Sequence, residues 1–82
     1  MGRFYFHLKD GDELTLDEEG SELPGIDAAR KEALQAAREL LGEAIRQGAE
    51  KVWEALVIAD GDGRTIEVLP LAAVLPRSLR QP

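Results

Sequence analysis

The stretch that decides the fold is Ala28–Gln47, AARKEALQAARELLGEAIRQ. Projected at about 100° per residue, its charged side chains fall on one half of a helix, and its alanines, flanked by larger aliphatic residues, fall on the other half. This pattern predicts an amphipathic helix about 30 Å long. Asp27 is the predicted N-cap, because its carboxylate can accept free N–H groups of the first turn. Gly48 is the predicted residue after the C-cap, where a left-handed conformation is common.

The apolar side of this helix covers about 180°, wider than the roughly 100° stripe that packing against one surface requires. Its alanines permit close approach to a sheet. The remaining flank, formed by Leu34, Leu41 and Ile45, then needs a second cover. Two alternatives exist for covering this flank: the C-terminal segment LPLAAVL, residues 69–75, or the same helix of a second copy of the chain.

The segment before the helix predicts a β-hairpin, because apolar and polar residues alternate in Arg3–Lys9 and again in Glu13–Asp17. With Gly11 at the centre of the turn, Lys9 faces Glu13 across the two strands. In this register the inward side chains are Phe4, Phe6, Leu8, Leu14 and Leu16.

The segment after the helix predicts a second hairpin, with strands on both sides of a three-residue loop, Gly61-Asp62-Gly63. This loop places Asp60 opposite Arg64 and gives Gly63 the positive φ that such loops need. The inward side chains are then Leu56, Ile58, Ile66 and Val68.

These elements predict a single α+β domain, residues 1–76, in the order β-β-α-β-β, followed by a flexible C-terminal tail, residues 77–82. One long helix packs on a four-stranded antiparallel sheet. The other sheet face carries an unusually apolar set of side chains, and large exposed apolar patches usually mark contacts. This set is Tyr5, His7, Thr15, Trp53, Val57 and Leu69.

Composition excludes several function classes. The 82 residues hold 10 basic and 16 acidic side chains, a net charge of −6, which argues against nucleic acid and anionic membranes as partners. The absence of cysteine leaves no disulfide or thiolate metal centre. The first residues do not resemble a secretory signal, and the longest apolar run is far shorter than the roughly 20 residues of a membrane span. We expect a cytoplasmic protein.

Acidic residues gather in three places. The two Asp-Gly-Asp stretches, 10–12 and 60–62, are best explained as turns, because Asp and Gly are favoured turn residues. A calcium-binding EF-hand loop that began at Asp60 would need Gly and Glu where Thr65 and Leu71 stand. A third cluster could hold Mg²⁺ or Ca²⁺, or could be a solvated loop that places negative charge near the start of the helix. It comprises Asp17, Glu18, Glu19 and Glu22. The prediction is no metal site and no cofactor.

No arrangement of residues suggests catalysis. His7 is the only histidine and has no evident nucleophile beside it, and no glycine-rich phosphate loop occurs. We therefore expect a protein that is not an enzyme. His7 is predicted to be a sheet-face residue; the alternative is a group that titrates near neutral pH at an interface.

Several segments resemble a known family. They are RFYFH at residues 3–7, Asp10-Gly11, DEEGSELP at 17–24, AAR at 28–30, and the turn at 60–63. Over about residues 2–70 the chain resembles a small domain-of-unknown-function family of alpha-proteobacteria. The resemblance implies a family but no mechanism, so it assigns no catalytic residue.

The sequence thus predicts a non-catalytic interaction module that forms a homodimer and can bind another protein. The candidate contact residues are Tyr5, His7 and Trp53 on the sheet, and Leu34, Leu41 and Ile45 on the helix. The alternative is a small-molecule or divalent-metal binding protein that uses the outer sheet face or the acidic loop.

Overall fold

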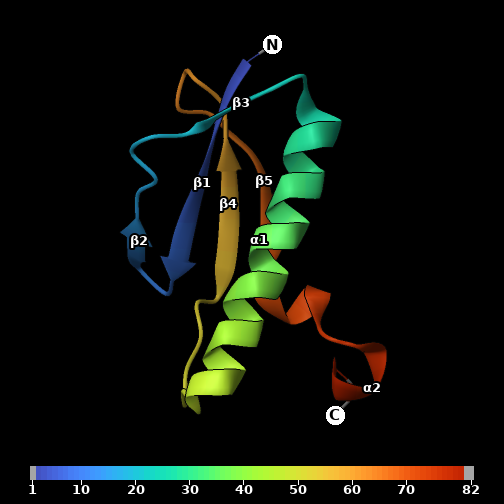
Figure 1. The fold of residues 1–82 in the computed structure, drawn as a ribbon. Coiled ribbons are helices and arrows are strands. Elements are labelled where there is room, and N and C mark those ends of the chain that lie inside the picture. Colours follow the sequence, from blue (N-terminus) through green and yellow to red (C-terminus); the bar gives the residue numbers. More distant parts are fainter. Residues whose placement is uncertain (1, 81–82) are drawn as a thin grey trace.

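A computed structural model describes residues 2–80 and shows one long helix across one face of an antiparallel sheet (Figure 1). The predicted α+β class is confirmed, with one strand more than predicted. The elements are β1 (Gly2–Asp10), β2 (Glu13–Thr15), β3 (Ser21–Leu23), α1 (Ile26–Gln47), β4 (Ala55–Ala59), β5 (Thr65–Pro70), the 3₁₀-helix η1 (Leu71–Val74) and α2 (Arg77–Arg80).

The strand order is β2-β1-β4-β5, with β3 also paired to β1, and every pair is antiparallel. β1 is long enough to hold two short strands: residues 8–10 pair with β2, and residues 2–4 pair with β3. The sequence pattern missed β3 because three residues are too few for an alternation to be recognised.

The predicted register of the first hairpin is wrong by one residue. Leu14 lies opposite Lys9, because the loop holds two residues, Gly11 and Asp12, rather than three. Gly11 has φ +61°, which suits the first central position of a type II′ turn. A one-residue slip moves every side chain of a strand to the other face. Leu14 and Leu16 therefore lie on the outer face, the side of the sheet away from α1.

The second hairpin begins as predicted and then departs from the prediction. The Asp60 N–H donates to the Arg64 carbonyl at 2.9 Å, and Gly63 has φ +85°. A β-bulge follows, where β5 holds one residue more than β4. This extra residue turns Val68 to the outer face and Leu69 toward the core, which reverses their predicted positions.

The long helix confirms one predicted end and corrects the other. The helix ends at Gln47, as predicted, and the C-cap residue Gly48 has φ +68°. Its N-terminus lies at Ile26, two residues earlier than predicted, so Gly25 is the N-cap residue. Asp27 consequently sits in the first turn and makes no capping hydrogen bond. The predicted alanine contact with the sheet is confirmed, since three alanines are fully buried: Ala29, Ala33 and Ala37.

The core lies between α1 and the inner face of the sheet, and the C-terminal segment covers part of it. The largest fully buried side chains are Leu56, Ile58 and Leu71. Leu71 begins η1, which lies against α1 (Figure 1), and Val74 also packs on the core. Residues 69–75 thus provide the first of the two covers considered for the helix. Beyond them, α2 contributes no buried residue; the last two residues of the predicted tail lie outside the described part of the chain.

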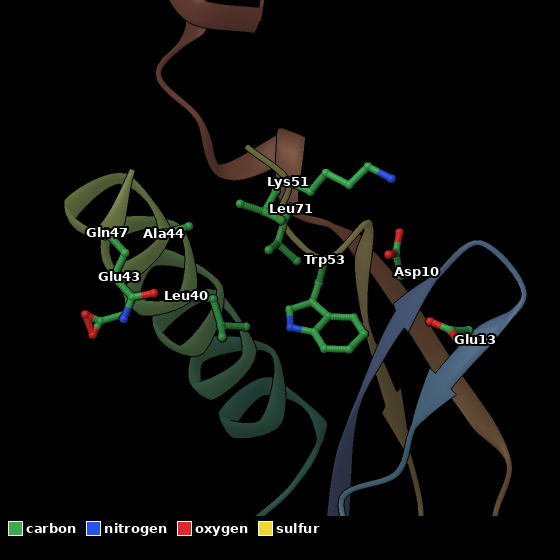
Figure 2. Close-up of a pocket in the computed structure, with 10 residues that line it drawn as sticks. Asp10, Glu13, Leu40, Glu43, Ala44, Gln47, Lys51, Trp53 and Leu71 are labelled. Carbon is green, nitrogen blue, oxygen red and sulfur yellow. The ribbon is translucent and has the colours of Figure 1, made fainter. Parts of the chain in front are cut away.

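The predicted position of Trp53 is also wrong, because this side chain lies on the helix side of the sheet rather than on the outer face. The chain bends at Glu54, just before β4, so the alternation of β4 does not extend back to Trp53. The indole lies between Leu40 of α1 and the β1–β2 hairpin (Figure 2), and it packs against the core.

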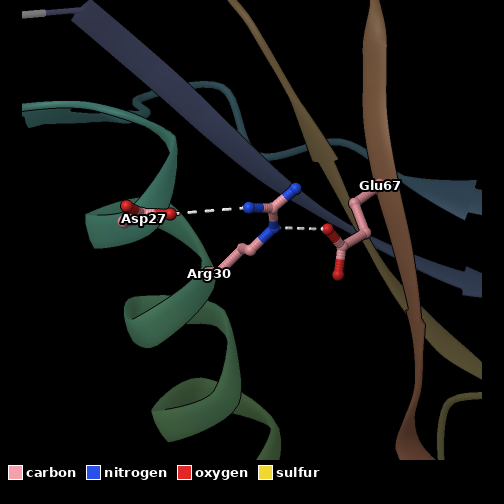
Figure 3. A network of polar contacts seen from close by, with 3 residues as sticks. All are labelled: Asp27, Arg30 and Glu67. Carbon is pink, nitrogen blue, oxygen red and sulfur yellow. Dashed lines mark hydrogen bonds and ion pairs between the residues drawn. The ribbon is translucent and has the colours of Figure 1, made fainter.

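Arg30 links the start of α1 to β5. Its Nε lies 2.7 Å from the Glu67 carboxylate, and its Nη1 lies 3.5 Å from Asp27 (Figure 3). The hydrogen bond and the charge of Glu67 raise the pKa of the Arg30 guanidinium. Since all three side chains are solvent-accessible, we assign this network a role in orienting the helix, with a small contribution to stability.

Candidate functional site

The most prominent candidate site is an apolar patch on the outer face of the sheet. We define the outer-face patch as Tyr5, His7, Leu14, Leu16, Val57 and Val68. Leu14, Leu16 and Val68 are about half exposed, at 49%, 58% and 48%. A shallow hollow of about 550 Å³ lies over most of this patch, and Asp17, Glu18 and Asp60 are also among the residues that line it.

The patch keeps part of the predicted set and exchanges the rest. Tyr5, His7 and Val57 lie on the outer face as predicted. The bend at Glu54 places Trp53 on the helix side instead. The two-residue turn exchanges Thr15 for Leu14 and Leu16 on the outer face, and the bulge in β5 exchanges Leu69 for Val68. In the sequence, Gly11 is the residue that could have indicated the two-residue turn, since Gly at the first central position of such a loop favours a type II′ turn.

Two aromatic rings form the centre of the patch. Tyr5 and His7 stack with ring centroids 6.2 Å apart and planes 21° apart. Nδ1 of His7 accepts the backbone N–H of Asp17 at 3.0 Å. His7 is therefore held in place by a hydrogen bond to the loop that follows β2, which supports a positioned sheet-face residue.

The Asp17 carboxylate organises that loop. Its Oδ2 accepts the N–H of Phe6 at 3.1 Å, in the gap along β1 between β2 and β3. Its Oδ1 accepts the N–H groups of Glu19 and Gly20, both at 3.2 Å. The side chain thus supplies the acceptors that a continuous neighbouring strand would otherwise provide.

Gly20 closes the same loop and is required there by both conformation and space. Its φ is +71°, and a Cβ at this position would lie 2.8 Å from the Tyr5 ring and 3.0 Å from the Phe4 carbonyl oxygen. Gly20 belongs to the segment DEEGSELP, one of those that carry the family resemblance, and this close approach requires a glycine there.

Opposing effects act on the pKa of Asp17. Partial burial raises it, whereas the N–H donors of Phe6, Gly20 and Glu19 and the nearby His7 lower it. The net result is a pKa below the usual Asp value of 3.8. Asp17 therefore remains ionised down to more acidic pH than a free carboxyl, as its role as a hydrogen-bond acceptor requires.

Two further acidic residues, Asp60 and Glu54, also accept backbone N–H groups. Oδ1 of Asp60 accepts the N–H groups of Asp62 and Arg64, both at 2.9 Å, which confirms the interpretation of this stretch as a turn. Oε1 of Glu54 accepts the Gly11 N–H at 3.0 Å and lies 3.4 Å from Lys9, and both contacts lower the pKa of Glu54. Among residues 2–80, no three histidine, aspartate or glutamate side chains gather closely enough to hold a metal ion.

The helix flank proposed as a second contact surface is divided. Leu34 and Leu41 are half-buried, and Leu41 packs against the core, whereas Ile45 is 71% exposed. Much of the flank is therefore covered within the chain, and Ile45 stands apart from the outer-face patch on the opposite side of the sheet. No helix within residues 2–80 has the length and apolar character needed to cross a membrane.

Residues 3–72 match the sequence model of a family described as a domain of unknown function, DUF6894. The chain belongs to this family. The matched range takes in β1 to β5 and the first residues of η1, and so includes the outer-face patch, the Asp17 loop and α1. No curated protein and no solved structure matches the chain.

Proposed function

We propose that the protein is a non-catalytic interaction module that forms a homodimer through the outer-face patch. The observation that carries the proposal is an uncovered sheet face with a stacked Tyr5–His7 pair and three half-exposed aliphatic side chains, Leu14, Leu16 and Val68. Helix α1 covers the inner face only (Figure 1). The proposal includes the cytoplasmic location and the bacterial origin that the sequence suggests.

The structure favours the sheet face over the helix as the seam. Because η1 lies against α1 and Leu41 packs on the core, the helix has less need of a second copy. The outer face has no comparable cover among residues 2–80, and sheets commonly pack face to face with their inner side chains interdigitated.

The exposed areas set the strength of the dimer. Complete burial of a Val or Leu side chain contributes about 1.5–3 kcal/mol, so hiding the exposed half of one contributes about 1 kcal/mol. Three such residues in each copy contribute about 6 kcal/mol in a symmetric pair, against an association cost of at least about 4 kcal/mol. The balance of about 2 kcal/mol corresponds to a Kd of roughly 30 mM, so a dimer populated near 1 mM, which requires about 4 kcal/mol, also needs burial of the half-buried Tyr5 and His7 rings.

Sedimentation equilibrium at increasing protein concentration tests the proposal, with Leu16→Glu as the variant and Ile45→Glu as the matched control. Leu16 lies in the patch and Ile45 on the helix, and both are strongly exposed, so neither change should disturb the core. Leu16→Glu should weaken dimerisation at least about 30-fold, because about 1 kcal/mol is lost in each copy. Ile45→Glu should leave it unchanged.

Salt provides a second readout. Asp17, Glu18 and Asp60 line the hollow over the patch, so two copies that meet there bring negative charges close together. Screening of this repulsion should strengthen the dimer as salt rises. A chain that is monomeric near 1 mM, or a dimer weakened by Ile45→Glu and not by Leu16→Glu, would refute the proposal.

A further inference from the structure

A second cavity lies on the helix side of the sheet, away from the outer-face patch. Figure 2 shows Trp53 at its centre, between Leu40 of α1 and the β1–β2 hairpin. The cleft has a volume of about 310 Å³, at the small end of the range for ligand sites. Its apolar wall is formed by Leu40, Ala44, Trp53 and Leu71.

The hairpin side of this cleft carries an unrelieved pair of like charges. Asp10 and Glu13 are direct cross-strand partners, an arrangement that is destabilising for two carboxylates. None of the ion pairs formed within residues 2–80 involves either of them. Two further charged groups line the cleft, Glu43, which is paired with Arg46 at 3.2 Å, and Lys51. Because Glu43 is paired with Arg46, the carboxylates of Asp10 and Glu13 and the ammonium of Lys51 leave the lining with one negative charge in excess.

An indole ring beside two carboxylates that form no ion pair fits a cationic ligand. The face of Trp attracts a cation more strongly than that of any other aromatic side chain. The neighbouring carboxylates add charge-assisted hydrogen bonds to an N–H donor. The apolar wall accommodates the rest of such a molecule, in the manner of ligand sites with a few polar groups on a mostly apolar surface.

We propose that the Trp53 cleft binds a small organic cation, an ammonium or guanidinium group on a compact apolar body. The aromatic ring and the wall hold the body, and Asp10 and Glu13 receive the charged group. This site is independent of the dimer proposed above, because it lies on the opposite side of the sheet and shares no residue with the outer-face patch.

Trp53 is the only tryptophan of the chain, so its fluorescence reports directly on the cleft. Benzylammonium is the test cation, and benzyl alcohol is the matched neutral probe of nearly the same shape. We expect a saturable fluorescence change with benzylammonium, half-complete at about 1–10 mM, the affinity that so small a molecule reaches. Benzyl alcohol should bind at least about tenfold more weakly. N-acetylarginine amide, titrated in the same way, shows whether the cation is better supplied as a free amine or as an arginine side chain.

The double variant Asp10→Asn, Glu13→Gln removes the charges and keeps the tryptophan. It should weaken benzylammonium at least about tenfold without lowering the melting temperature, since a repulsive pair is relieved. The double variant Glu32→Gln, Asp62→Asn removes the same number of charges outside the cleft and should leave binding unchanged. Absence of saturation, equal binding of benzyl alcohol, or equal weakening by this control variant would overturn the proposal.

Discussion

Replacing Asp17 by alanine should destabilise the domain more than the loss of any other single acidic side chain. Its carboxylate accepts three backbone N–H groups, from Phe6, Glu19 and Gly20. Two of these contacts are partly buried, at Phe6 and Gly20, and the third is exposed. Asp17→Ala leaves the Phe6 N–H without its acceptor in the middle of β1.

The structure sets the size of the effect. A hydrogen bond to a charged group contributes about 1.5–3 kcal/mol, and partial exposure reduces that value. Two partly buried bonds at about 1–1.5 kcal/mol each, with little from the third, give about 2–3 kcal/mol. For a domain of this size each kcal/mol shifts the melting temperature by about 4–8 °C, so we expect a decrease of about 10–20 °C.

Thermal melts of the wild type, Asp17→Ala, Asp17→Asn and Glu18→Ala test this expectation. Asparagine keeps only one of the two acceptor oxygens, so Asp17→Asn should lose at least half as much stability as Asp17→Ala. Glu18 is an exposed carboxylate of the same loop, and its removal should cost less than about 0.5 kcal/mol.

The pH dependence follows from the lowered pKa of Asp17. A carboxyl whose folded pKa lies below its unfolded value stabilises the fold fully above the unfolded pKa, near 3.8, and loses that contribution as pH falls through the folded pKa. The gap between wild type and Asp17→Asn should therefore be larger at pH 7 than at pH 3. Equal melting of wild type and Asp17→Ala would refute the role of the side chain, and a gap independent of pH would refute the role of its charge.

Two further substitutions probe the fold. Gly20→Ala should destabilise more than Gly11→Ala, by at least about 1 kcal/mol, because both positions have positive φ but only at Gly20 would a Cβ collide with Tyr5 and backbone; urea unfolding measures both, and equal losses would contradict the close approach. Leu71→Ala should cost about 2–5 kcal/mol, because the side chain of this first residue of η1 is 1% exposed. Leu79→Ala, in the exposed helix α2 that follows, should cost less than about 0.5 kcal/mol, and similar losses in calorimetry would show that residues 69–75 do not cover the core.

The amino-acid sequence by itself determined the elements whose signals are local. The 3.6-residue pattern of Ala28–Gln47 specified α1 and the alanine face that meets the sheet. Gly48 and Gly63 marked positions of positive φ, and Asp60 marked a turn, because each of these conformations depends on one or two residues. The resemblance to a domain-of-unknown-function family was carried by equally local segments, and the chain does belong to a family of that description.

Tertiary structure decided which face each strand presents. A loop of two residues rather than three, and one additional residue in β5, reversed Leu14, Leu16 and Val68 from the core to the outer face. The bend at Glu54 took Trp53 to the helix side in the same way. Side chains in a strand alternate with a period of two, so a local shift of one residue, which changes little in the sequence pattern, inverts a whole face. Both candidate sites of this protein, the outer-face patch and the Trp53 cleft, follow from those inversions.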